Sequence, residues 1–112
     1  MNWGLTGFSA WLVQRLSALY IGTFLLFVVI ALTLYAPADF ESWRHWIATP
    51  GVWAAWFMFF VAVILHAWIG IRDVILDYIR PMGLRLMVLV VLGFGLLALA
   101  VLALRALLSV VV

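Results

Sequence analysis

The sequence predicts an all-α integral membrane protein with three transmembrane helices. Of its 112 residues, 71% are hydrophobic and only 9% are charged, and there is no lysine. A chain of this composition has too little polar surface to cover a water-soluble globule. Its three long runs without formal charge, over residues 16–36, 51–71 and 86–104, suit helices that cross a bilayer. We therefore expect a single membrane domain over residues 1–112.

The first helix is predicted over residues 16–36. As a helix this run would be about 31 Å long, which matches the hydrocarbon thickness of a bilayer. The uncharged segment before it, residues 1–14, is aromatic enough to be a lead-in lying at the membrane interface. A cleavable signal peptide is an alternative, because residues 36–38 (Ala-Pro-Ala) resemble a cleavage site. A retained helix is favoured, since the run is long for a signal and two more apolar segments follow.

A loop is predicted over residues 37–50. Prolines stand at both of its ends and its charges are of both signs, as is typical of a loop. Trp43 and Trp46 within it favour a position at the membrane–water boundary. We expect His45, in the same segment, to be a solvated surface imidazole without a functional role.

The second and third helices are predicted over residues 51–78 and 82–108. Between them, Pro81 disfavours a helical conformation at the preceding Arg80 and is itself well placed to begin the next helix. A connection this short makes the two helices antiparallel neighbours.

The arginines predict the orientation in the membrane. Four lie on the side of the connection between the second and third helices: Arg15, Arg72, Arg80 and Arg85. Two lie on the other side: Arg44 and Arg105. By the positive-inside rule the N-terminus is then cytoplasmic and the C-terminus periplasmic.

The composition also excludes several classes of function. The net charge of +2 comes from few charges and no basic patch, so nucleic-acid binding is not indicated. The absence of cysteine excludes disulfides, cysteine-ligated clusters and covalent c-type haem attachment. There is no glycine-rich phosphate loop and no nucleophile with an adjacent base. We expect a chain that is not catalytic alone.

His66 is the main candidate for a functional residue. An ionisable side chain at membrane depth is costly without a partner, which makes it a functional-site hypothesis by default. On a helix, Ala55, Ala62 and Gly70 project within roughly 40° of His66. Such small residues allow a flat group to lie against the backbone, and imidazole is a common axial ligand of haem iron. The alternative is close helix packing, with His66 as an interhelical hydrogen-bonding residue.

The segment from His66 to Arg85 resembles the small hydrophobic membrane-anchor subunits of bacterial succinate dehydrogenases. The resemblance is carried by HAWIG at 66–70, DY at 77–78, RP at 80–81 and GLRL at 83–86. It extends more weakly to Arg15 and to the three-segment layout of the chain.

This resemblance implies roles for particular residues. His66 would be an axial ligand of the iron of haem b, and Tyr78 would line a ubiquinone site. Arg15 would pair with a haem propionate; its alternative role is to reach the lipid headgroups. Apart from the resemblance, quinone reduction needs protons, which Asp77 or Asp73 with water could supply; Asp73 more simply pairs with a neighbouring arginine. The alternative for Tyr78 is an anchor in the interfacial aromatic belt.

The resemblance also implies partners. One histidine fills one of two axial positions, so the second haem ligand would lie on another chain, the companion cytochrome b556 anchor. The iron–sulfur subunit would dock above both anchors, with the flavoprotein subunit beyond it, at the bacterial inner membrane. Two alternatives remain: a haem-free structural anchor like those of fumarate reductases, and an unrelated small membrane assembly protein.

Overall fold

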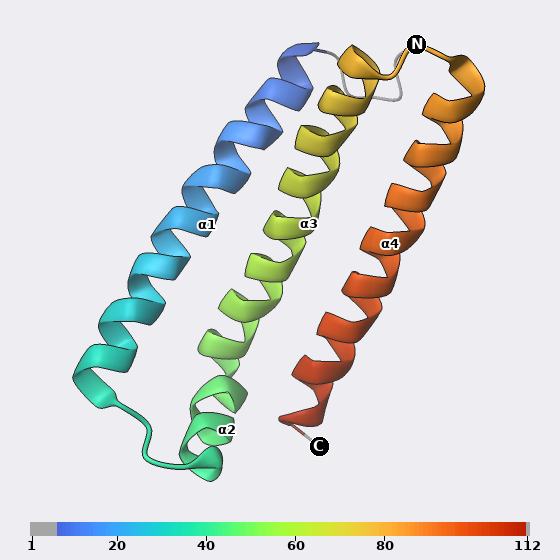
Figure 1. Ribbon diagram of the computed structural model, residues 1–112. Helices are drawn as coiled ribbons and strands as arrows, with labels where there is room; N and C mark the ends of the chain where they lie inside the picture. The colour runs from blue at the N-terminus through green and yellow to red at the C-terminus, as the bar shows by residue number, and fades with distance from the viewer. Residues whose placement is uncertain (1–6, 112) are drawn as a thin grey trace.

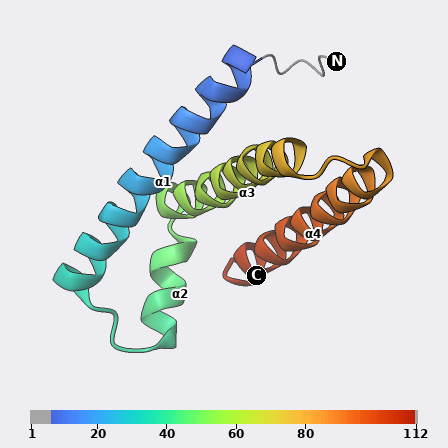
Figure 2. The same cartoon turned by 45° about the horizontal axis from the view of Figure 1, so that its top comes forward.

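Three long helices and one short one make up the computed structural model, which describes residues 7–111 (Figure 1). They are α1 (Gly7–Tyr35), α2 (Phe40–Ala48), α3 (Pro50–Tyr78) and α4 (Met82–Ser109). By length and composition α1, α3 and α4 can each cross a membrane, as the sequence predicted. Figure 2 shows α3 between α1 and α4, with α2 beside the start of α3. A helix of 29 residues is about 43 Å long, so its ends extend beyond the roughly 30 Å hydrocarbon layer.

Helix α1 begins at Gly7, nine residues before the predicted start at 16. The prediction placed the boundary after Arg15, because a charge marks the edge of the hydrocarbon layer. A charge does not end a helix, however, since the backbone hydrogen bonds continue past it. Residues 7–14 are therefore the first two turns of α1 rather than a separate lead-in, and residues 1–6 of that predicted lead-in lie outside the described residues.

The prediction of a loop over residues 37–50 is wrong for the part that forms α2. Asp39 is the N-cap of this helix, and its carboxylate accepts a hydrogen bond from the Ser42 backbone N–H at 2.8 Å. Hydrogen bonds from the backbone and then the side chain of Ser42 hold the pKa of Asp39 below its ordinary value. The cap is therefore complete above the unfolded-state pKa of about 3.9 and weakens as the pH falls through the lower folded-state pKa.

Arg44 connects α2 to the end of α4. Its guanidinium donates to the carbonyl oxygen of Val110 at 2.9 Å and forms an exposed ion pair with Glu41 at 3.3 Å. A cation at the C-terminal end of a helix meets carbonyl groups that have no partner within that helix. The short helix therefore closes the end of the α3–α4 hairpin opposite the Arg80–Pro81 connection.

Helices α1 and α3 pack along a seam with a seven-residue spacing. The buried residues of α1 are seven apart along the chain: Ala10, Ser17, Phe24 and Ala31. On α3, Ala62 and Ile69 show the same spacing. Side chains repeated every seven residues keep two helices in contact at a small crossing angle, and small residues let the backbones approach closely.

Polar side chains join the long helices near the α2 end. The Tyr20 hydroxyl of α1 donates to the carbonyl oxygen of Ala55 in α3 at 2.7 Å. The indole N–H of Trp53 in α3 donates to the carbonyl oxygen of Leu107 in α4 at 2.8 Å. Such bonds are favoured in lipid, where water does not compete for the groups.

Most apolar side chains face outward from this row of helices. Leu107 is the buried residue of α4, whereas Phe94 on the same helix is 69% exposed. A water-soluble protein does not expose a continuous apolar surface of this size. The outer faces are therefore suited to lipid or to other membrane helices.

Candidate functional site

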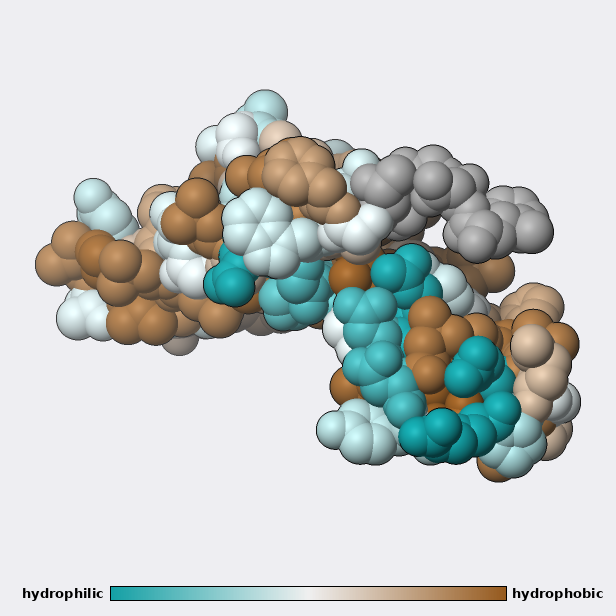
Figure 3. Space-filling view, turned by 90° about the horizontal axis from the view of Figure 1, so that it is seen from above, coloured by the Kyte–Doolittle hydropathy of each residue, from teal (hydrophilic) through white to brown (hydrophobic). Residues whose placement is uncertain are grey.

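The charged side chains of α1, α3, the α3–α4 connection and the first turn of α4 lie toward one end of the molecule. Figure 3, viewed onto this end, shows hydrophilic side chains gathered over one lobe, where α3 joins α4. The residues of this charged end are Arg15, Arg72, Asp73, Asp77, Arg80 and Arg85. The opposite end carries α2 and the last turns of α4.

A cavity of about 460 Å³ lies between α1 and α3 near the charged end. His66 and Arg15, which are 51 positions apart in sequence, both line it. Its volume falls within the range of roughly 300–1,000 Å³ that is usual for small-molecule sites. The other residues that line it are Gly7, Ala10, Trp11, Gln14, Ala18, Ile69, Arg72 and Asp73.

His66 is half-buried, and one of its ring nitrogens is engaged with α1. Its Nδ1 lies 3.1 Å from the Ser17 hydroxyl oxygen, and that hydroxyl also donates to the carbonyl oxygen of Gln14 at 3.1 Å. The Nε2 atom of His66 has no hydrogen-bond partner among residues 7–111. Nε2 is therefore the ring nitrogen that remains available to a ligand.

The small residues near His66 are used for helix packing. Ala62 is buried, and a Cβ atom added at Gly70 would lie 3.2 Å from Nε2 of Gln14 in α1. The carbonyl oxygen of Ala55 accepts a hydrogen bond from the hydroxyl of Tyr20, which is also on α1. Helix α1 thus packs against the small residues on which we expected a flat group to lie, as the packing alternative predicts for this stripe.

Arg15 stands at the edge of the cavity without an acidic partner in the described part of the chain. Its guanidinium carbon is 5.6 Å from the centre of the Trp11 ring, a cation–π contact that holds an exposed side chain in place. Beside it, Oε1 of Gln14 is buried with no hydrogen-bond partner among the described residues. The cavity therefore offers one unpaired cation and one unsatisfied polar atom to whatever occupies it.

Asp73 pairs with Arg72, as the sequence favoured. The guanidinium and the carboxylate are 3.1 Å apart, and the Asp73 side chain is 56% exposed. An exposed pair of this kind contributes at most about 1 kcal/mol of stability. We assign it no further role.

Tyr78 and Asp77 are not brought into the cavity. Tyr78 is the last residue of α3 and is 79% exposed, and Asp77 is exposed beside it. Because Tyr78 and His66 are twelve residues apart on one continuous helix, the rise between them is about 18 Å. The two candidate residues therefore belong to separate places, one at the surface and one deeper.

Sequence reasoning missed the role of Arg85, which served there only to predict orientation. Its guanidinium donates to the carbonyl oxygens of Ile79 at 3.0 Å and Leu76 at 3.1 Å, and so caps the end of α3. These two carbonyls flank Tyr78 in the chain, so the cap fixes the backbone that carries the phenol. The signal was present, since basic residues near a helix C-terminus commonly bond its last carbonyls.

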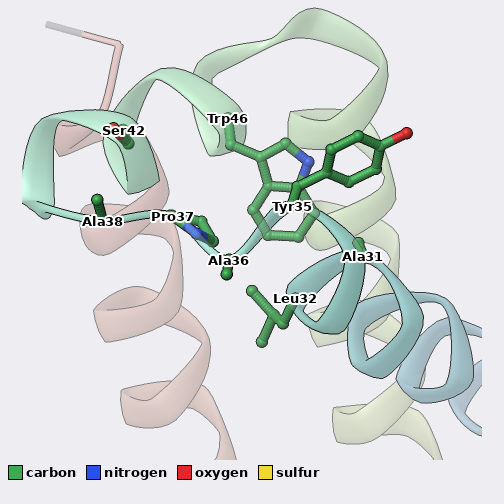
Figure 4. A pocket seen from close by; sticks show the side chains of 8 residues that line it. All are labelled: Ala31, Leu32, Tyr35, Ala36, Pro37, Ala38, Ser42 and Trp46. Atoms are coloured by element: carbon green, nitrogen blue, oxygen red, sulfur yellow. The ribbon is translucent and has the colours of Figure 1, made fainter.

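A second cavity, of about 390 Å³, lies at the opposite end between α1 and α2 (Figure 4). Its lining includes Tyr35 and Trp46 but no acidic, basic or imidazole side chain. Within residues 7–111 there is also no group of three or more His, Cys, Asp or Glu side chains placed to hold a metal ion. A single imidazole suits a metal that brings most of its own ligands, as iron in a porphyrin does.

The fold and the site together define a small three-span membrane subunit with an ionisable cavity between two of its spanning helices. The chain matches the family described as succinate dehydrogenase/fumarate reductase transmembrane subunit over residues 1–111, and it belongs to that family. It is also similar to the succinate dehydrogenase hydrophobic membrane anchor subunit of Coxiella burnetii, with 28% identity over 80 residues. That alignment covers 71% of this chain and 70% of the relative. The protein is thus a multi-pass protein of the bacterial inner membrane.

Proposed function

We propose that this chain anchors a succinate dehydrogenase to the membrane, supplies His66 as an axial ligand of haem b and contributes Tyr78 to a ubiquinone site. One observation carries the haem assignment: an imidazole and an unpaired guanidinium from different helices line the same cavity. Family membership supports the anchoring role. The chain is not catalytic alone, and it completes an electron path that begins in other subunits.

The residues around the cavity fit the groups of a haem. Haem b supplies one-electron chemistry at its iron when it is bound. Nε2 of His66 is the nitrogen that would hold that iron, since Nδ1 is already engaged with Ser17. The planar guanidinium of Arg15 suits a propionate carboxylate, which it can bind through two hydrogen bonds. The unsatisfied amide oxygen of Gln14 can accept a hydrogen bond from water at the same edge.

The quinone role belongs to the charged end. Reduction of ubiquinone to ubiquinol consumes two electrons and two protons, so its site needs a hydrogen-bond donor to a carbonyl oxygen and a route for water. The exposed hydroxyl of Tyr78 is a suitable donor. Asp77, exposed beside it, can exchange protons with water. Arg85 keeps both on an ordered helix end through its bonds to Leu76 and Ile79.

The proposed orientation follows from the same charged end. Four of the six arginines lie toward it, which by the positive-inside rule favours the cytoplasmic side for Tyr78 and the periplasmic side for the C-terminus. The iron–sulfur subunit would then dock over Tyr78, with the flavoprotein subunit beyond it. The exposed outer faces of the helices leave room for the companion cytochrome b556 anchor, which would supply the second axial ligand.

A haem-free anchor like those of fumarate reductases is the second candidate. It is favoured by the packing of the small residues and by the His66–Ser17 contact, because both also suit a purely structural helix pair. It shares the anchoring role with the first proposal. The two differ in whether iron is bound.

The absorption spectrum of the purified complex tests the proposed function. We would purify the complex through a tag on this chain, record the reduced-minus-oxidised visible spectrum and identify the chains that co-purify. The proposal expects the bands of a six-coordinate b-type haem together with a flavoprotein and an iron–sulfur protein. The soluble subunits without haem would favour the haem-free anchor. Absence of those subunits would contradict the anchoring role itself.

Replacing Arg15 tests the proposed propionate contact. Arg15→Leu removes the cation and should weaken haem retention or move the haem midpoint potential, whereas losing a side chain that only reaches headgroups should change neither. Arg15→Lys should retain part of the wild-type haem binding and potential, since lysine keeps the charge but not the planar fork. Redox titration of the purified complex measures the midpoint potential, and haem quantification measures retention. Arg105→Leu, at the opposite end of the molecule, is the matched control and should behave as the wild type. If Arg15→Leu also has the wild-type haem content and midpoint potential, Arg15 is not part of the site.

A further inference from the structure

We propose that Ser17 is a positioning residue for His66: its hydroxyl oxygen accepts a hydrogen bond from Nδ1–H and holds the imidazole as the tautomer whose Nε2 carries a free lone pair. This inference rests on the proposed haem function, because it concerns the nitrogen that would bind iron. It adds a residue of α1 to the site and gives that residue a defined chemical task.

Two contacts of the Ser17 hydroxyl carry the argument. The Ser17 hydroxyl oxygen lies 3.1 Å from the carbonyl oxygen of Gln14 and 3.1 Å from Nδ1 of His66. In its hydrogen bond with Gln14 the Ser17 hydroxyl is the donor, because a carbonyl oxygen can only accept, and this bond uses the single hydroxyl proton. The hydroxyl oxygen is then left with lone pairs only, and the contact with His66 is a hydrogen bond when Nδ1 is the donor.

The position of Ser17 makes this contact hard to replace. Ser17 is 7% exposed and occupies one position of the seven-residue seam of α1, where the other positions hold Ala10, Phe24 and Ala31. A buried hydroxyl in such a seam needs partners, because neither lipid nor the apolar neighbours can supply them. Both of its partners belong to the site: one is on its own helix and the other is the candidate ligand.

For metal binding, the consequence is that the imidazole of His66 already has the tautomer and orientation it needs before iron binds. A neutral imidazole with its proton on Nδ1 presents an unprotonated Nε2, whereas the other tautomer cannot bind a metal through Nε2. A hydrogen bond from the remote N–H also raises the basicity of the coordinating nitrogen and fixes the plane of the ring. A more basic ligand stabilises ferric over ferrous iron, so the bond to Ser17 should lower the haem midpoint potential.

Three variants of the intact complex test this inference. Ser17→Ala removes the acceptor, and Ser17→Thr keeps a hydroxyl at the same position. Ser109→Ala is the matched control, since the Ser109 hydroxyl donates at 2.6 Å to Ala106, three residues earlier on its own helix, just as Ser17 does to Gln14. The measurements are the midpoint potential of the haem, its visible spectrum, and the haem content per assembled complex.

We expect Ser17→Ala to raise the midpoint potential and to weaken haem binding by about tenfold, as is usual when a residue that holds a metal ligand is removed. If the ratio of ferric to ferrous affinity falls tenfold, the potential rises by about 59 mV for one electron. Ser17→Thr and Ser109→Ala should keep wild-type values.

Several outcomes would overturn the proposal. A wild-type potential and haem content in Ser17→Ala would show that the hydroxyl does not position the ligand. A changed potential or haem content in Ser17→Thr, or loss of assembly in either Ser17 variant, would show that Ser17 acts through packing. None of these results removes the haem function, which fails separately if the wild-type complex has no haem or if His66→Ala leaves the haem unchanged.

Discussion

Replacing His66 with alanine is expected to remove one axial bond of the haem and to produce the largest spectral change of any substitution in this chain. Among residues 7–111, His66 is the imidazole within a helix long enough to span the membrane, and its Nε2 has no hydrogen-bond partner there. The variant complex should show a shifted reduced b-type spectrum, lower haem occupancy, or both. Visible spectroscopy and haem quantification of the purified complex measure these quantities.

His45→Ala is the matched control for this experiment. His45 is exposed on α2, at the opposite end of the molecule from the cavity, and we expect its removal to leave the spectrum unchanged. Succinate oxidation by an artificial acceptor should persist in both variants, because that reaction uses the soluble subunits. A wild-type spectrum and full haem content in His66→Ala would end the assignment of His66 as a ligand.

The spanning helices were predictable because hydropathy reports directly on what the membrane requires. A segment that must satisfy its own backbone groups in lipid has to be a long apolar helix, and α3 and α4 begin and end within one residue of the predicted limits. The start of α1 was not predictable in this way. Its first two turns lie beyond the charge of Arg15, where hydropathy no longer distinguishes a helix from an interfacial segment.

Helix α2 was missed because proline and mixed charges were given more weight than helix capping. Asp39 caps the helix, and aromatic residues follow at positions 40, 43 and 46, a spacing of three that places them along one helix face. Those observations were enough to predict a short helix between the two prolines.

The candidate site was predictable residue by residue but not as an arrangement. Depth in the membrane singled out His66, and the resemblance singled out Arg15, yet neither could show that the two line one cavity. That Ser17 bonds His66 depends on how α1 lies against α3, which the sequence specifies only through a seven-residue repeat. The small residues near His66 are the reverse case: their pattern is visible in the sequence, but only the structure shows that α1 covers them.

The second large expected effect is the loss of quinone reduction in Tyr78→Phe. If the phenol donates a hydrogen bond to a quinone carbonyl, removing the hydroxyl costs roughly 1–3 kcal/mol when the partner is left unsatisfied. Quinone reductase activity should then fall by about an order of magnitude or more. Succinate oxidation by an artificial acceptor should remain, which separates a damaged quinone site from a damaged assembly.

Tyr35→Phe is the matched control, because Tyr35 is also an exposed tyrosine at the end of a spanning helix, 81% exposed against 79% for Tyr78. It lies at the α2 end, far from the proposed quinone site. If both tyrosines were only interfacial anchors, phenylalanine would keep most of the affinity of either ring for the interface, and both variants would keep wild-type activity. The proposal requires the two to differ. Wild-type quinone reduction and inhibitor sensitivity in Tyr78→Phe would move the donor role to Asp77 or to a partner chain, since the Arg85 cap leaves the rest of this helix end in place.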